Sequence, residues 1–184
     1  LPLMREHYGD NHSDVASVHQ LLALARLCTG DLSGARQDAQ VAIELRTRLD
    51  GEAHPRTLGA RGAMAMIDEA AGRLVDAQRA ADSIRAQSGW MQLNGLTRAR
   101  LEGIRLFHAE SAVRSRCEAL SGAHAQATDP SGSRLLALYL AACWRGVGAH
   151  PQAEALLAGL IPEQPGEFAG DPALVRLRAQ ALMR

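Results

Sequence analysis

The chain repeats itself at a fixed spacing, and this repetition limits the possible folds more than any other feature of the sequence. The stretch from His12 to Gly51 returns in degraded form from His54 onward, always 42 positions further on. The same residue types at one constant offset indicate a stacked structural repeat. The matched positions are His12 and His54, Ala23 and Ala65, Gly30 and Gly72, Leu32 and Leu74, Ala35 and Ala77, and Ala39 and Ala81.

Each unit predicts a pair of antiparallel helices. In the first unit, Ser13 or Asp14 is expected to cap a helix that is apolar nearly all round, as in a helix covered on several sides. Gly30 is expected to end that helix in a left-handed conformation. Asp31 is expected to cap the second helix, in which apolar residues recur every three or four positions.

These features resemble the tetratricopeptide repeat (TPR) family, which has a small residue in the first helix, Gly-Asp at the turn and alanine in the second helix. The long period and the linkers Gly9–His12 and Gly51–His54 resemble the kinesin-light-chain type, although Ser13 replaces the proline after the first linker. The resemblance implies an all-α fold. It would be a right-handed α-α superhelix (TPR-like solenoid) of about four helix pairs with a terminal capping helix.

We expect the remaining chain to follow the same plan with one irregular unit. Helices are expected at Trp90–Phe107 and Ser111–Ala125, and Ser133 is expected to restart a helix after a Pro-Gly breaker. Because the chain opens inside a repeat helix, we expect it to be a piece of a longer protein. The expected division is the end of a preceding repeat helix at 1–11, TPR-like repeats at 12–51 and 52–88, a diverged helix pair at 89–128, a TPR-like repeat at 131–166 and a C-terminal capping helix at 171–184.

Charge and hydropathy argue against two kinds of partner. The 20 basic and 20 acidic residues balance, which gives no reason to expect binding to nucleic acid. No apolar run approaches the ~20 residues of a membrane span, so we expect no membrane insertion in this segment and a cytoplasmic location. The chain is rich in alanine and arginine, which favours a bacterial source with a GC-rich genome. One arginine-rich stretch is interrupted by glutamates and lacks an aromatic ladder: Arg98, Arg100, Arg105, Arg114 and Arg116.

Catalytic and metal-binding motifs are missing from the sequence. There is no nucleophile elbow, phosphate loop or His-Glu-x-x-His, so we predict no enzyme activity and no cofactor. Cys28, Cys117 and Cys143 lack metal or redox spacing, and each is expected to be a buried free thiol. The adjacent acids Asp68 and Glu69 are expected on a solvated helix face. Metal-ligand residue types near the N-terminus are assigned to the linker, with no metal site: Glu6, His7, Asp10, His12 and Asp14.

The resemblance also implies a concave groove lined by the first helix of each pair, where a partner segment would bind. Its lining is small and apolar, which suits an apolar extended or helical peptide. The alternative is that these residues only pack one repeat on the next. The groove positions are Ser17, Gln20, Leu24, Gly59, Gly62, Met66, Leu135, Leu138, Ala142 and Arg145.

Two functions stay open at this point. The first is a non-catalytic protein–protein interaction module from a larger protein, which binds a protein or peptide partner in the groove. The second is a regulatory, sensor or self-association domain of a bacterial signalling protein such as a kinase or transcription regulator, with a homodimer as one form. The first function predicts an open groove with an apolar strip. The second predicts a closed cavity, or a strip buried against another copy.

Overall fold

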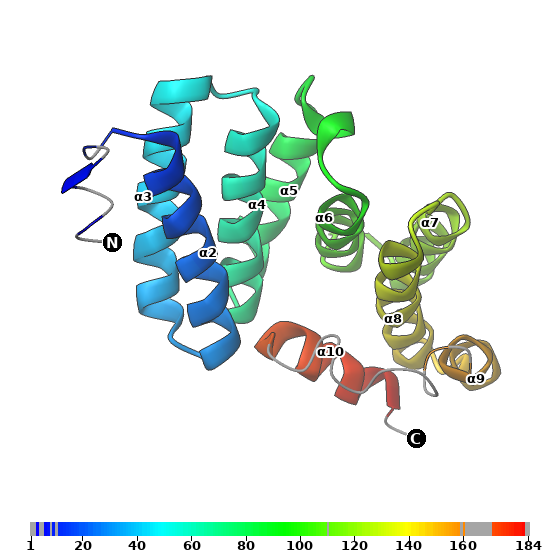
Figure 1. The fold of residues 1–184 in the computed structure, drawn as a ribbon. Coiled ribbons are helices and arrows are strands. Elements are labelled where there is room, and N and C mark those ends of the chain that lie inside the picture. The colour runs from blue at the N-terminus through cyan, green and yellow to red at the C-terminus, as the bar shows by residue number, and fades with distance from the viewer. Residues whose placement is uncertain are drawn as a thin grey trace.

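The computed structural model describes residues 3, 6–7, 9, 11–109, 111–158, 160 and 171–182. Every regular element in these ranges is helical, which confirms the all-α prediction (Figure 1). The predicted repeat helix at 1–11 lies mostly outside the described residues. The elements are α2 (Ser13–Thr29), α3 (Leu32–Asp50), α4 (Pro55–Ala70), α5 (Leu74–Arg85), η1 (Trp90–Gln92), α6 (Gly95–Phe107), α7 (Val113–Ala125), α8 (Pro130–Gly146), α9 (His150–Ala158) and α10 (Pro172–Leu182).

The repeated histidines are helix caps. The ring Nδ1 of His12 accepts the backbone N–H of Asp14 at 3.2 Å, and Nδ1 of His54 accepts that of Arg56 at the same distance. Both histidines have extended backbones, and Pro55 follows at the first helical position of α4, where a missing N–H costs nothing. The prediction that Ser13 or Asp14 caps α2 is therefore wrong. The cap is one residue earlier, because the imidazole reaches the free N–H groups of the first turn.

Glycines end the first helices as expected. Gly30 has φ 82° and donates its N–H to carbonyls of the last turn of α2. Gly72 has φ 77° just beyond the end of α4, and Gly148 has φ 76° between α8 and α9. This left-handed backbone is accessible to glycine without a Cβ penalty. The turns between paired helices therefore fall where the glycines predict them.

Consecutive helices pack against one another. Each of α2 to α6 contacts the next helix, and α2, α4, α6 and α8 also contact one another in sequence. Small residues permit the close approach, since Ala23, Ala35 and Ala39 are almost fully buried in one cluster. This arrangement is compatible with a helical repeat solenoid. The superhelix and its hand remain predictions.

The irregular unit contains a break that the sequence pattern conceals. The helix expected at Trp90–Phe107 is divided into η1 and α6, because Leu93 is extended and Asn94 caps α6 by accepting the N–H of Thr97 at 2.8 Å. The following α7 buries little of its surface and is joined to α8 by a disulfide between Cys117 and Cys143.

The disulfide corrects the cysteine prediction. Cys117 and Cys143 are buried as expected, but their sulfurs are bonded to each other. Cys28 is a free thiol as expected, but it is exposed. The spacing of 26 residues shows no recognisable motif, because the pairing depends on how α7 lies against α8.

Helix α8 is the centre of the second half. It begins at Pro130, with Asp129 accepting the N–H of Gly132 at 2.6 Å, so the prediction of a start at Ser133 is wrong. It contacts α6, α7, α9 and α10, which explains why most of its residues are buried. Gly103 of α6 lies so close to the ring of Tyr139 that a Cβ would clash with it.

The C-terminal helix α10 has a wider role than capping. It starts at the predicted Asp171-Pro172 and packs mainly on α8, but it also contacts α4. In Figure 1 it runs across the lower edge of the molecule from the end of α4 toward α9. The helix thus bridges two parts of the array. No helix within the described ranges is long and apolar enough to span a bilayer.

Candidate functional site

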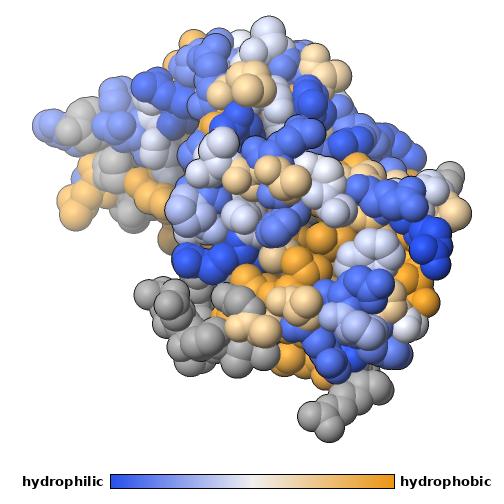
Figure 2. Space-filling view, turned by 90° about the vertical axis from the view of Figure 1, so that its right-hand side faces the viewer, coloured by the Kyte–Doolittle hydropathy of each residue, from blue (hydrophilic) through white to orange (hydrophobic). Residues whose placement is uncertain are grey.

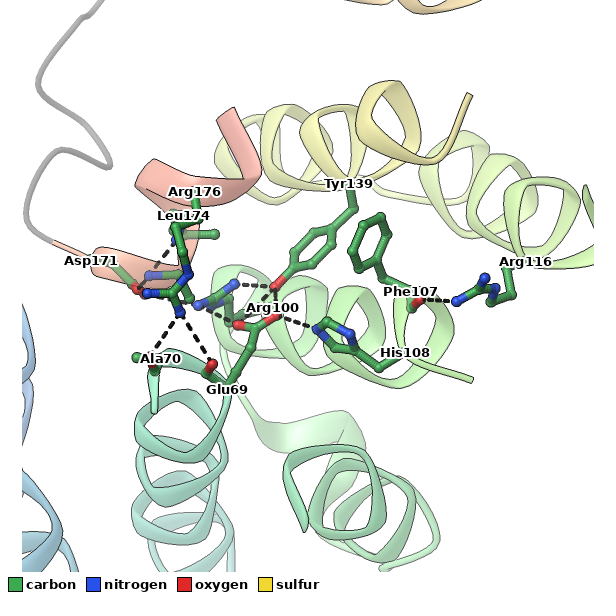
Figure 3. A network of polar contacts seen from close by, with 11 residues as sticks. Glu69, Ala70, Arg100, Phe107, His108, Arg116, Tyr139, Asp171, Leu174 and Arg176 are labelled. Carbon is green, nitrogen blue, oxygen red and sulfur yellow. Dashed lines mark hydrogen bonds and ion pairs between the residues drawn. The ribbon is translucent and has the colours of Figure 1, made fainter. Parts of the chain in front are cut away.

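A buried polar network lies where α4, α6, α8 and α10 meet (Figure 3). Its centre is Glu69, at the end of α4. Its carboxylate lies 2.7 Å from Nη2 of Arg100, accepts the hydroxyl of Tyr139 at 2.9 Å, and lies 2.9 Å from Nε2 of His108. The expectation that Glu69 is solvated is wrong, because Glu69 is only 5% exposed.

The neighbouring Asp68 is also buried, in the opposite direction. Its carboxylate accepts Arg73 at 2.8 Å and is paired with Arg36 of α3. Adjacent residues on a helix point to different sides, so Asp68 joins α4 to α3 while Glu69 joins it to α6 and α8. The signal that could have revealed both is their position: two acids stand inside the otherwise apolar run from Met64 to Ala71.

Arg100 connects the network to α10. Its Nη2 donates to Asp171 at 2.9 Å, Nη1 donates to the hydroxyl of Tyr139, and the guanidinium lies over the Tyr139 ring at 5.6 Å. Burial alone would lower the pKa of Arg100, but interaction with Tyr139, Glu69 and Asp171 raises it above its usual value. Arg100 is therefore a permanent buried cation with two carboxylate partners.

The pKa values of Glu69 and Tyr139 are shifted in opposite directions. Burial tends to raise the pKa of Glu69, but Arg100, His108 and Tyr139 together lower it below its usual value. Burial raises the pKa of Tyr139 well above its usual value, against the opposing charge of Arg100 and with the help of Glu69. Glu69 is thus an anion and Tyr139 a neutral donor. Because the charges of these groups are paired with one another, the network is better suited to holding four helices together than to transferring protons.

Metal binding has no support in the described geometry. Among the residues that the structure describes, no group of three or more His, Cys, Asp or Glu side chains lies together as a metal site would require. Asp10, from the N-terminal set of ligand types, lies outside those residues.

Helix α10 presents a narrow apolar stripe to the array. Leu174, Leu177 and Ala181 belong to the same core cluster as Leu135, Leu138 and Ala142 of α8. Ala173 belongs to a second cluster formed by α2, α3 and α4, against which Met66 packs. The stripe is therefore buried in the same two clusters as groove positions predicted from the sequence on α8 and α4.

Polar contacts hold both ends of α10. At its start, Asp171 is paired with Arg100 as described above, and at its end Nε of Arg145 donates to the carbonyl of Ala181 at 3.0 Å. Between them, Arg176 donates to the carbonyl of Ala70 at 2.8 Å, which satisfies a free acceptor at the C-terminus of α4.

Two clefts border α10. One, of about 430 Å³, is lined by Phe107 and by the basic side chains of Arg116, Arg145 and His150. The other, of about 340 Å³, is also lined by Phe107 and lies next to the Glu69 network. Figure 2 shows the face that includes α7 and α9, where apolar side chains gather near the centre and toward the right-hand edge among hydrophilic ones.

The predicted groove positions are only partly accessible. On α2 and α4, Gln20 lies beside Gly59, and Ser17 accepts a hydrogen bond from Arg46 of α3 at 2.6 Å. A Cβ at Gly62 would touch Leu101 of α6. Their role as a binding surface stays a prediction. The buried positions are Gly62, Leu135, Leu138 and Ala142, and the half-buried ones are Ser17, Gln20, Leu24, Gly59, Met66 and Arg145.

Comparison with known proteins gives one partial likeness. No family model matches the chain, and no solved structure matches it. The chain is similar to human tetratricopeptide repeat protein 23, with 37% identity over 65 residues. The match covers 35% of this chain and 14% of that protein, so the chain spans a small part of the relative's length. Together with the all-helical fold, this likeness fits a TPR-like family, and the kinesin-light-chain subtype stays a prediction.

Proposed function

We propose that this chain is a non-catalytic protein-interaction module whose first helices form a face that binds an α-helical segment. In the structure the chain's own α10 packs against part of these helices, mainly on α8 and also on α4. The partial likeness to a TPR protein supports the assignment to this class of scaffold.

The observation that carries the proposal is the shared core between α10 and α8. Leu174 and Leu177 are each 5% exposed, and they are buried in one cluster with Leu135 and Leu138. Val175, on the opposite side of α10, is 49% exposed. A helix with one apolar stripe laid on a helical surface is a known mode of peptide recognition.

Release of α10 tests the proposal. In the full chain, Leu174→Asp with Leu177→Asp should free the face, while Val175→Asp serves as the matched control on the exposed side. A labelled peptide with the sequence of residues 171–182 is then added, and binding is measured by fluorescence anisotropy. We expect the released variant to bind the peptide at least about tenfold more tightly than the wild type, because a tethered helix competes at about millimolar effective concentration.

The outcome is decided on folded protein. Circular dichroism should show that the released variant keeps its helices, and Leu177→Ala replaces the double change if it does not. A folded released variant that fails to bind the peptide would refute a helix-binding face.

The regulatory and self-association function remains the second candidate, because several of the predicted groove positions are buried. It predicts a dimer whose interface includes this face, whereas the first proposal predicts a monomer by light scattering.

The cytoplasmic location also stays a prediction. Disulfides are more typical of oxidising compartments, so a count of free thiols in protein isolated under non-reducing conditions tests it.

A further inference from the structure

The contacts at the two ends of α10 would select a helix of defined length. Asp171 uses its carboxylate twice. Oδ1 accepts the N–H of Ala173 at 2.8 Å and so caps the helix, while Oδ2 is paired with Arg100 of the array. One acidic cap thus satisfies both the helix and the buried cation.

The other end is recognised through the backbone. Arg145 is 10% exposed, and its Nε donates to the carbonyl of Ala181, one of the acceptors that a helix leaves free in its last turn. A cation at this end also interacts favourably with the helix dipole. Because the contact is made with main chain, it demands a helix end at that place and accepts many side chains.

The two contacts set a distance. Asp171 and Ala181 are ten positions apart, which corresponds to about 15 Å along a helix. Between them, the array contacts the stripe of Ala173, Leu174 and Leu177. Arg176 adds a donor for the carbonyl of Ala70, which no apolar side chain could supply.

We propose that the partner of this face is an amphipathic helix of about three turns. It begins with an acidic cap, carries an arginine five positions later, and its last turn presents a free backbone carbonyl to Arg145 of α8. α10 is the intramolecular copy of that partner. This inference rests on the proposed helix-binding function and adds the chemistry that selects the helix.

Peptide variants test the selection without disturbing the array. The released variant Leu174→Asp with Leu177→Asp is titrated with the peptide of residues 171–182 and with its Asp171→Asn form. Asparagine still caps a helix but lacks the charge that Arg100 requires, so we expect about tenfold weaker binding. A peptide with Val175→Gln, changed on the exposed side, should bind like the unmodified one.

The far end is tested by a double-mutant cycle. Arg145→Gln in the released chain should weaken binding of the 171–182 peptide by about tenfold. The affinity of a 171–180 peptide, which lacks the Ala181 carbonyl, should stay unchanged. If the unmodified peptide binds and both Asp171→Asn and Arg145→Gln leave its affinity unchanged, the selection is refuted while the helix-binding face stands. If no peptide binds to the folded released variant, the proposed function itself fails.

Arg145→Gln must keep the circular dichroism spectrum of the released chain. If it does not, the 171–180 and 171–182 peptides with and without Asp171→Asn decide the matter.

Discussion

The two halves of this molecule are held together in different ways. From α2 to α5, helix ends follow a repeated pattern of histidine and glycine, and the interfaces combine buried alanines with polar pairs between neighbouring helices. From α6 to α10, the pattern fades, and a buried ion network and a disulfide join the helices. The comparison teaches that a repeat can lose its sequence pattern when specific long-range bonds replace uniform packing.

The sequence distances of the polar bonds express the same contrast. Within the first pair, His19 bonds to Asp38 and Arg46 to Ser17, with separations of 19 and 29 residues. The second half reaches back to α4 over much longer distances, since Tyr139 bonds to Glu69 across 70 residues and Arg176 bonds to Ala70 across 106. The first half is thus made of nearest neighbours, whereas the second depends on contacts that close across the chain.

The largest expected effect comes from removing the central cation. Arg100→Met should lower the free energy of unfolding by about 3–5 kcal/mol, because it leaves Glu69 and Asp171 without their buried partner. Arg46→Met is the matched change in the first half. It should cost only about 1–2 kcal/mol, since Arg46 bonds mainly to two serines and its one carboxylate partner, Asp50, is also paired with Arg56. Urea titration of both variants measures the difference. Equal losses would show that the two halves do not differ in this respect.

Loss of the disulfide should come next. Replacing both Cys117 and Cys143 by serine should destabilise the protein by about 3.5 kcal/mol, from the entropy of the loop that the bond closes in the unfolded chain. Cys28→Ser is the control, because that thiol is exposed and should change stability by less than about 0.5 kcal/mol. Thermal unfolding with and without a reducing agent provides a second measurement. An unchanged midpoint in the reduced wild type would contradict the bond's role.

Two glycines in the second half should respond in opposite directions. Gly103→Ala should destabilise by about 1–3 kcal/mol, because the new methyl group meets the Tyr139 ring where α6 and α8 touch. Gly122→Ala in α7 has open space around it and should stabilise by up to about 1 kcal/mol through helix propensity. Denaturation midpoints decide the matter. A stabilising Gly103→Ala would mean that the two helices are not in such close contact.

The acid dependence of stability is a subtler effect of the same network. Since the pKa of Glu69 is lower in the folded protein than its ordinary value of 4.5, its stabilising contribution is present above that pH and is lost as the pH falls through the folded pKa. Glu69→Gln should therefore flatten the acid side of the stability profile. Glu44→Gln, at an exposed position of α3, is the control for a loss of one surface carboxylate.

The smallest expected effect concerns the repeated caps. His54→Ala should cost about 0.5–1 kcal/mol, because the N–H of Arg56 loses its acceptor. His54→Asn keeps an acceptor at the cap and should remain within about 0.5 kcal/mol of the wild type. The free energy of unfolding from urea titration compares them. An asparagine variant as unstable as the alanine variant would argue against a capping role.

The sequence predicts the helices well where local chemistry decides them. The helix end at Gly30 and the start at Asp171-Pro172 depend on neighbouring residues alone, and both are confirmed. The burial of Glu69 and the pairing of Cys117 with Cys143 depend on residues that only the folded chain brings together. A charge looks the same in a sequence whether its partner is water or a distant arginine, so composition and periodicity favoured the wrong environment.

The bond between Cys117 and Cys143 has one more consequence. It encloses the exposed connection between α7 and α8, where residues 125, 126 and 128 face the solvent. A protease that cuts there would sever the backbone and still leave a single covalent molecule. Such nicked protein would migrate as one band on a non-reducing gel and as two fragments once the thiols are reduced.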